Sequence, residues 1–182
     1  FADFVDLEKL GGFIVKGTTL KAREGNPYPR SAETPMGMLN AVGLQNPGID
    51  HVIAHELPEM KKYFNKKVVA NISGFAVEEY VKCASMLDSE DSVGILEINI
   101  SCPNVHGGGM SFGTNPKSAA EVTKAVKAVT TKPVVIKLTP NVTDIKEMAL
   151  ACEEAGADGV SLINTLLGMR IDLRKKRPLL AN

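Results

Sequence analysis

The sequence predicts an α/β protein built on a parallel β-sheet, and three observations lead to this prediction. Short runs rich in β-branched residues recur along the chain, and patterns typical of amphipathic helices lie between them. Most of these runs are apolar throughout, which is typical of strands covered on both faces. Alternation of strands with helices favours a parallel sheet with right-handed crossovers.

Five runs are predicted to form the strands: residues 12–17, 67–72, 94–100, 133–138 and 159–164. Polar side chains fall at or near the carboxyl end of each run. They are Lys16, Asn71, Asn99, Lys137 and Asn164. In a β/α barrel, that end of the strands carries the active site. We therefore expect these side chains to converge on one rim.

Three helices are predicted between the strands. One covers residues 76–87, a second begins at Pro116 with Asn115 as its N-cap, and a third begins after Asp144. Gly156 stands where the third helix should end. Two apolar stripes support the second and third helices: Ala119, Val122, Val126 and Val129, and Ile145, Met148, Ala149 and Cys152. Such stripes predict helices packed on one side against the sheet.

The segment 18–48 has no clear periodicity, and a structureless segment of this length is usually functional or disordered. Its apolar and small residues favour order. They are Met36, Met38, Leu39, Ala41, Val42 and Leu44. We expect this segment to form an ordered cover over a site.

Composition excludes several classes of protein. The chain has 182 residues, enough for one domain, and its formal net charge of zero gives no electrostatic footprint for nucleic acid. No apolar run reaches the ~18 residues needed to span a membrane. Three cysteines without CxxC spacing favour reduced thiols and a cytoplasmic protein over a disulfide framework or a metal site. The chain begins with Phe1 and shows no signal peptide, so we expect a processed chain or a fragment.

The stretch "NISCPNVHGGG" (99–109) contains the candidate catalytic residue. Cys102 follows a predicted strand and precedes a proline and a glycine-rich loop, whereas Cys83 and Cys152 lie on apolar helical stripes and fit a structural role. A thiol in that position is a candidate base. His106 is the alternative base, and the glycines at 107–109 predict a hinged lid.

Two other clusters are expected to be surface features. His51 and His55 have i, i+4 spacing, but no third metal ligand accompanies them. The basic run "RKKR" (174–177) is predicted to be a solvated hairpin or tail, since four charges do not make a nucleic-acid site.

Six motifs together resemble the class 1 dihydroorotate dehydrogenases: "VKGTTL" (15–20), "REGNP" (23–27), "LNAVGLQNPG" (39–48), "NISCPN" (99–104), "KLTP" (137–140) and "INTLLGMR" (163–170). They span nearly the whole chain in the family's order. The longer stretch "ETPMGMLNAVGLQNPG" (33–48) resembles subtype B. That subtype implies a partner: an electron-transfer subunit carrying FAD and an iron–sulfur cluster, joined to a homodimer of catalytic subunits in a heterotetramer.

The resemblance implies a (β/α)8 TIM barrel that binds FMN. Residues 1–182 would form one partial barrel domain covering about strands 2–6, with the first strand before Phe1 and the last two after Asn182. The implied reaction oxidises dihydroorotate to orotate in pyrimidine biosynthesis. Cys102 matches the family's base, and hydride passes to FMN, with electrons going on to NAD through the partner subunit.

The resemblance also assigns binding residues. The implied FMN contacts are Lys16, Gly17, Asn71, Asn99, Lys137 and Ile163. The implied substrate contacts are Lys16, Asn40, Ala41, Val42, Gly43, Leu44, Asn99, Asn164 and Thr165. The chemistry agrees, because asparagine amides both donate and accept, and a lysine stabilises the negative charge of a reduced flavin.

Three alternatives stay open at this point. One is a flavin barrel like that of dihydropyrimidine dehydrogenase, which uses a similar cysteine as an acid on uracil or thymine. Another is a Schiff-base aldolase using Lys137 at its strand end. The last is a half-barrel that only binds a partner.

Overall fold

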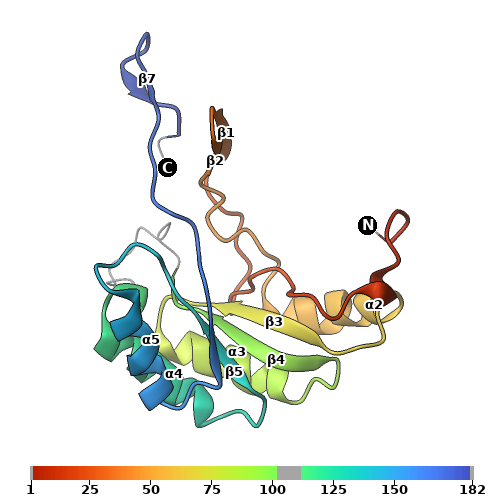
Figure 1. The fold of residues 1–182 in the computed structure, drawn as a ribbon. Helices are drawn as coiled ribbons and strands as arrows, with labels where there is room; N and C mark the ends of the chain where they lie inside the picture. The colour runs from red at the N-terminus through yellow and green to blue at the C-terminus, as the bar shows by residue number, and fades with distance from the viewer. Residues whose placement is uncertain (1, 102–111, 181–182) are drawn as a thin grey trace.

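A four-stranded parallel sheet forms the centre of the protein (Figure 1). The computed structural model describes residues 2–101 and 112–180. The strands are β3 (Val68–Ser73), β4 (Val93–Asn99), β5 (Val134–Lys137) and β6 (Gly159–Ser161), adjacent in sequence order. These four predicted strands are confirmed, although β6 ends three residues earlier than predicted.

The first predicted strand, residues 12–17, is not a regular strand. It runs parallel to the free edge of β3 and pairs with it only at isolated bridges, Ile14 with Val69 and Thr18 with Ile72. The backbone N–H of Val15 donates to the carbonyl of Val69 at 2.9 Å. The segment thus lies where a fifth strand would lie, but it makes too few backbone hydrogen bonds with β3 to form a regular strand.

Three amphipathic helices pack on one face of the sheet: α3 (Val77–Asp88), α4 (Pro116–Lys127) and α5 (Ile145–Glu154) (Figure 1). The predicted caps are confirmed, since the side chains of Asn115 and Asp144 each accept hydrogen bonds from two backbone N–H groups of the first turn. Gly156 follows α5 with φ of +98°, a conformation that favours glycine. The helices therefore begin and end where the sequence indicates.

The sequential strand order identifies the architecture. A doubly wound sheet reverses its strand order and carries helices on both faces, whereas a β/α barrel keeps its strands in sequence order with the helices outside. Here β3 to β6 are in sequence order and α3 to α5 share one face. The sheet is a segment of a β/α barrel, which confirms the predicted fold class.

The two faces of the sheet differ in chemistry. The helix-facing side chains are buried and apolar: Ala70, Ile72, Leu96, Ile98, Val134 and Ile136. The opposite face carries, in register, Asn71 beside Glu97 and then the row Ser73, Asn99, Lys137 and Ser161. The prediction that these runs are apolar throughout is therefore wrong for the second halves of the strands, which alternate.

The segment 18–48 is ordered but covers the sheet only in part. It contains an antiparallel hairpin of β1 (Ser31–Thr34) and β2 (Gly37–Asn40), which projects away from the sheet (Figure 1). Met36 is 97% exposed and Met38 is 64% exposed, so their predicted place in a cover is wrong. The hairpin instead contacts the segment after β6, where the guanidinium of Arg170 donates to the carbonyl of Glu33 at 2.8 Å.

The remaining elements are short. The N-terminal part contains η1 (Leu7–Lys9), followed after the hairpin by α1 (Ile49–His51), the π-helix η2 (Val52–Glu56) and α2 (Leu57–Lys61). The 3₁₀-helix η3 (Phe112–Thr114) precedes α4. A second antiparallel hairpin, β7 (Ile171–Asp172) and β8 (Arg177–Pro178), follows β6.

Both predicted clusters lie on the surface. His51 and His55 are exposed, with 4.6 Å between their ring centroids. Separately, residues 2–101 and 112–180 contain no group of three or more His, Cys, Asp or Glu side chains that could hold a metal ion. The "RKKR" run forms the exposed turn between β7 and β8. No helix in the described part of the chain has the length and apolar character to cross a bilayer.

Candidate active site

A cavity of about 430 Å³ lies at the carboxyl ends of the strands, within the size range of ligand pockets. Residues from distant parts of the chain meet there. Of the predicted site residues, it is lined by Lys16, Gly17, Asn40, Val42, Gly43, Leu44, Asn71, Asn99, Lys137, Asn164 and Thr165. The expectation that polar strand ends share one rim is met.

Two predicted residues do not line this cavity. Ala41 is 5% exposed and lines a neighbouring hollow beside residues 165–170, and Ile163 is 48% exposed. Cys102 lies outside the described residues, as do His106 and the glycines at 107–109. The cavity also takes in Ile14, Val15 and Glu97, which the sequence did not indicate.

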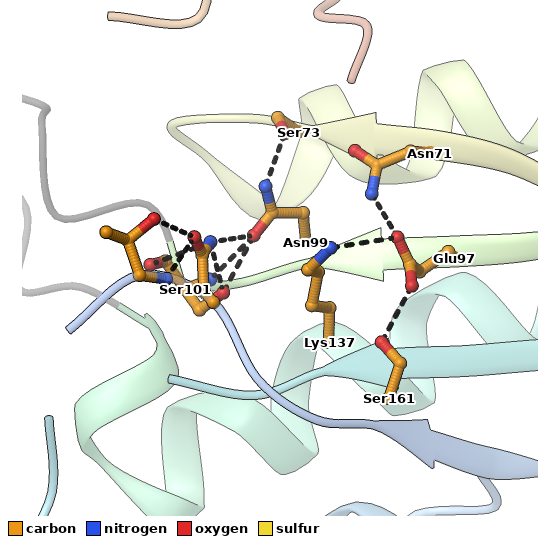
Figure 2. A network of polar contacts seen from close by, with 9 residues as sticks. Asn71, Ser73, Glu97, Asn99, Ser101, Lys137 and Ser161 are labelled. Carbon is orange, nitrogen blue, oxygen red and sulfur yellow. Dashed lines mark hydrogen bonds and ion pairs between the residues drawn. The ribbon is translucent and has the colours of Figure 1, made fainter. Parts of the chain in front are cut away.

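Glu97 is the centre of a buried polar network (Figure 2). Its side chain is only 2% exposed. One carboxylate oxygen, Oε2, accepts a hydrogen bond from Asn71 Nδ2 and lies 3.6 Å from Lys137 Nζ. The other, Oε1, accepts from the hydroxyl of Ser161 at 2.7 Å. Three donors from three strands thus surround one carboxylate, which offsets the cost of burying its charge.

Asn71 lines the cavity and carries a buried acceptor without a donor. The residue is 6% exposed, and among the described residues its Oδ1 has no hydrogen-bond partner. A Cβ on Gly17 would lie only 2.7 Å from this oxygen, so glycine is the residue that leaves room for it. A buried acceptor without a donor is costly and points to a ligand that supplies one.

Asn99 and Asn164 form a second polar cluster at the rim. Asn99 Oδ1 accepts from Ser101 Oγ at 2.8 Å and from Asn164 Nδ2 at 3.1 Å, and its Nδ2 donates to Ser73 Oγ at 3.2 Å (Figure 2). Asn164 Nδ2 also lies 2.8 Å from Ser101 Oγ. These bonds fix the orientation of both amides and anchor Ser101, the residue before Cys102.

The loop 42–44 offers backbone donors. Gly43 and Leu44 have φ values of 77° and 58°, and a Cβ on Gly43 would clash with Asn26 at 2.6 Å. Among the described residues, no acceptor is bound to the N–H groups of Val42, Gly43 or Leu44. Asn46 holds the loop in place, since its amide bonds both Thr19 and the carbonyl of Leu44. Free N–H groups at a cavity wall suit an anionic ligand.

Two lysines give the cavity its positive charge. Lys137 is paired with Glu97 at 3.6 Å. Lys16 is exposed, and no described carboxylate lies within ion-pair distance of its Nζ. The rim thus combines a paired cation with an unpaired one, beside asparagine amides.

The thiols on the helix-facing side are chemically inert. Cys83 and Cys152 are fully buried, as predicted for structural cysteines. Burial raises the pKa of the Cys83 thiol to about 12, with smaller contributions from the carboxylates of Glu79 and Asp50. Burial also raises the pKa of Cys152, against a hydrogen bond with Thr123. Neither thiol forms a thiolate at neutral pH.

Comparison with known proteins agrees with the predicted family. A family model described as dihydroorotate dehydrogenase matches residues 1–182. The chain is 59% identical over 181 residues to the catalytic subunit of dihydroorotate dehydrogenase B (NAD(+)) of Phocaeicola vulgatus. It is 57% identical to the proteins of that name from Bacteroides thetaiotaomicron and Desulforamulus reducens. The matches cover 100% of this chain and 59%, 59% and 60% of those three relatives, respectively.

Among solved structures, the carboxyl transferase domain of Rhizobium etli pyruvate carboxylase is similar with a TM-score of 0.45 and 19% identity. That match covers 58% of this chain and 18% of that one, too weak a likeness to carry an argument. The family model and the curated relatives, in contrast, cover the whole chain. The chain therefore belongs to the dihydroorotate dehydrogenase family.

Proposed function

We propose that residues 1–182 form one partial barrel domain of an FMN enzyme that oxidises dihydroorotate to orotate in pyrimidine biosynthesis. The observation that carries the cofactor assignment is the unpartnered Oδ1 of Asn71, a residue that lines the same cavity as Lys16 and Lys137. The pyrimidine edge of a flavin presents an N–H between two carbonyl oxygens. An acceptor accompanied by two cationic donors complements that edge. Gly17 keeps the space beside Asn71 open, and Asn99 and Ile163 complete the proposed FMN contacts.

The substrate assignment rests on the second cluster. Orotate is a flat ring of amide groups with one carboxylate. The oriented amides of Asn99 and Asn164 bind ring groups, with Thr165 beside them. Lys16, Asn40 and the backbone N–H groups of residues 42–44 bind the carboxylate, because among the described residues these N–H groups have no acceptor and Lys16 has no ion-pair partner. Ala41 stays a predicted contact, although its own N–H donates to the carbonyl of Arg30 at 2.8 Å.

Cys102 is the proposed base. It would remove a proton from the ring carbon beside the carbonyl, and FMN, when bound, would supply the acceptor for hydride from the neighbouring carbon. The hydrogen bonds of Ser101 to Asn99 and Asn164 fix the backbone just before Cys102 beside the substrate amides. Lys137 supports the reduced cofactor with its positive charge. It forms an ion pair with Glu97, an arrangement suited to a binding cation rather than to the neutral amine of a Schiff-base aldolase.

The names of the relatives support a partner subunit. Those proteins are called catalytic subunits of a dihydroorotate dehydrogenase that uses NAD(+). We propose that this protein acts in the cytoplasm as a homodimer bound to an electron-transfer subunit with FAD and an iron–sulfur cluster, and binds no nucleic acid.

Anaerobic titration of the full-length purified protein tests the reaction. A yellow protein that contains FMN and is bleached by dihydroorotate is expected. A colourless protein without flavin would overturn the proposal. A flavoprotein that turns over uracil or thymine faster than dihydroorotate would instead favour a pyrimidine reductase, and trapping by borohydride with a carbonyl substrate would favour an aldolase.

Reconstitution tests the partner. NAD reduction by dihydroorotate should require the flavin and iron–sulfur subunit. Efficient reduction of fumarate by the catalytic subunit alone would contradict this assignment and place the protein in subtype A.

A further inference from the structure

We propose that Glu97 is a positioning residue with two effects on the flavin site. It fixes the orientation of the Asn71 amide, and it neutralises part of the positive charge of Lys137. This inference rests on the proposed function, because it takes FMN as the ligand next to Asn71 and Lys137. The comparisons and the sequence motifs assign no role to this carboxylate. Its contacts are all with residues from neighbouring strands (Figure 2).

The first step concerns the direction of the Asn71 amide. An ionised carboxylate can only accept hydrogen bonds, so the group that Asn71 turns toward Glu97 must be Nδ2. The Oδ1 atom is then left buried against Gly17, with no hydrogen-bond partner among the described residues. Glu97 therefore selects ligands that present an N–H at this point and disfavours those that present a carbonyl.

The second step concerns charge. Glu97 Oε2 lies 3.6 Å from Lys137 Nζ, and the carboxylate is buried, so water screens the pair weakly. The negative charge of Glu97 offsets part of the positive charge that Lys137 presents to a reduced, anionic flavin. Glu97 thus holds the reduction potential of the cofactor lower than Lys137 alone would set it.

A purely structural role makes a different prediction. Glu97 also joins β4 to β3 through Asn71 and to β6 through Ser161, so its loss would loosen the sheet in either case. A structural link affects stability and, through it, cofactor retention. A purely structural link would not raise the reduction potential of bound flavin when the negative charge of Glu97 is removed.

The experiment uses the full-length protein with FMN and measures the FMN dissociation constant by fluorescence and the flavin potential by anaerobic dye equilibration. Glu97→Gln should weaken binding of oxidised FMN about tenfold, since the amide of Asn71 is no longer held in one orientation. It should raise the potential by about 30 mV, equivalent to tenfold tighter relative binding of the reduced form.

A double-mutant cycle supplies the decisive readout. Lys137→Met should lower the potential, because Glu97 is then unbalanced, and the double variant Glu97→Gln/Lys137→Met should return it toward the wild-type value. Ile98→Val is the matched control, since Ile98 follows Glu97 but is fully buried on the apolar face. It should change neither FMN affinity nor potential.

The outcomes separate this inference from the proposed function. A full-length protein that binds no flavin would overturn the proposed function itself. Normal FMN binding with wild-type affinity and potential in Glu97→Gln would overturn only the role of Glu97. If Glu97→Gln does not fold, Glu97→Asp keeps the charge but cannot reach Asn71 and Ser161 together. FMN binding by Glu97→Asp should still weaken, and unchanged affinity would contradict the proposed role of Glu97 in orienting Asn71.

Discussion

Adjacent residues on one strand face two different environments in this protein. Leu96 lies on the helix-facing side and is fully buried among apolar side chains, whereas Glu97 faces the cavity and is held by three polar groups. On the helix-facing side, the side chains of β3 to β5 are buried among other apolar residues of the described chain. The cavity side has an acceptor on Asn71 without a donor and N–H groups at 42–44 without acceptors among the described residues. One face therefore stabilises the fold and the other is built for a ligand.

The largest expected effect concerns Cys102, beyond the cavity end of β4. In the full-length enzyme, Cys102→Ala should slow flavin reduction by dihydroorotate by a factor of about 100 to 10,000, the usual loss for a missing general base. Binding of FMN and orotate should persist, because Asn71, Asn99 and Asn164 remain. Stopped-flow bleaching of the flavin measures the rate.

Cys102→Ser serves as the control for size and should be similarly slow, since a hydroxyl is a weaker base than a thiol at neutral pH. Reduction of Cys102→Ala at the wild-type rate would remove the thiol from the mechanism. His106 would then be the next base to test.

The second prediction concerns a cavity-creating substitution on the apolar, helix-facing side of the sheet. Leu96→Ala should destabilise the full-length protein by about 2–5 kcal/mol, because it leaves a cavity in a closely packed core. FMN affinity in the folded fraction should stay near wild type, since Leu96 points away from the site. Urea denaturation followed by circular dichroism measures the first quantity and flavin fluorescence the second. Leu96→Met, which conserves volume, should cost under about 1.5 kcal/mol. A large loss of FMN affinity at full stability would contradict the division between the two faces.

Local signals in the sequence predicted much of this arrangement. The caps Asn115 and Asp144 and the end of α5 at Gly156 depend on neighbours within a few residues. The four regular strands were recognisable from short β-branched runs, although their pairing joins distant segments. The polar residue at each strand end could also be read from the sequence, because parallel strands place their carboxyl ends on one edge.

Features set by contacts between distant segments were missed. The alternation L-E-I-N-I at 96–100 is visible in the sequence and could have indicated Glu97. Its partners could not be inferred, because Asn71 and Ser161 meet it only through the register of separate strands. The role of Gly17 likewise depends on the position of Asn71 across the sheet edge. Segment 12–17 looked like a strand by composition, but its tertiary setting allows only isolated bridges.

A smaller effect is expected at Gly17. A Cβ there would lie 2.7 Å from Asn71 Oδ1, too close for any ordinary contact, so Gly17→Ala should displace the Asn71 amide. FMN affinity should fall about tenfold, the loss of roughly one oriented hydrogen bond. Gly37→Ala is the matched control, because no atom lies within 4 Å of a Cβ at Gly37, and it should bind FMN normally. Fluorescence titration compares the two variants. Wild-type affinity in Gly17→Ala would argue against Asn71 as a flavin contact.

A pH-dependent effect is expected on the helix-facing side, through Cys83. Burial raises the pKa of its thiol to about 12, while an unfolded chain ionises near pH 8.5. Between these values the unfolded state binds fewer protons than the folded state, so stability falls as pH rises, by at most about 1.4 kcal/mol per pH unit. Cys83→Ala removes this component but leaves the titration of every lysine and tyrosine in place. The stability advantage of the wild type over Cys83→Ala, measured by urea denaturation under reducing conditions, should therefore shrink steadily from pH 8 to pH 10.5. A constant difference over that range would show that the helix-facing core tolerates a thiolate. It would contradict the view that this face excludes charge whereas the cavity face accommodates it.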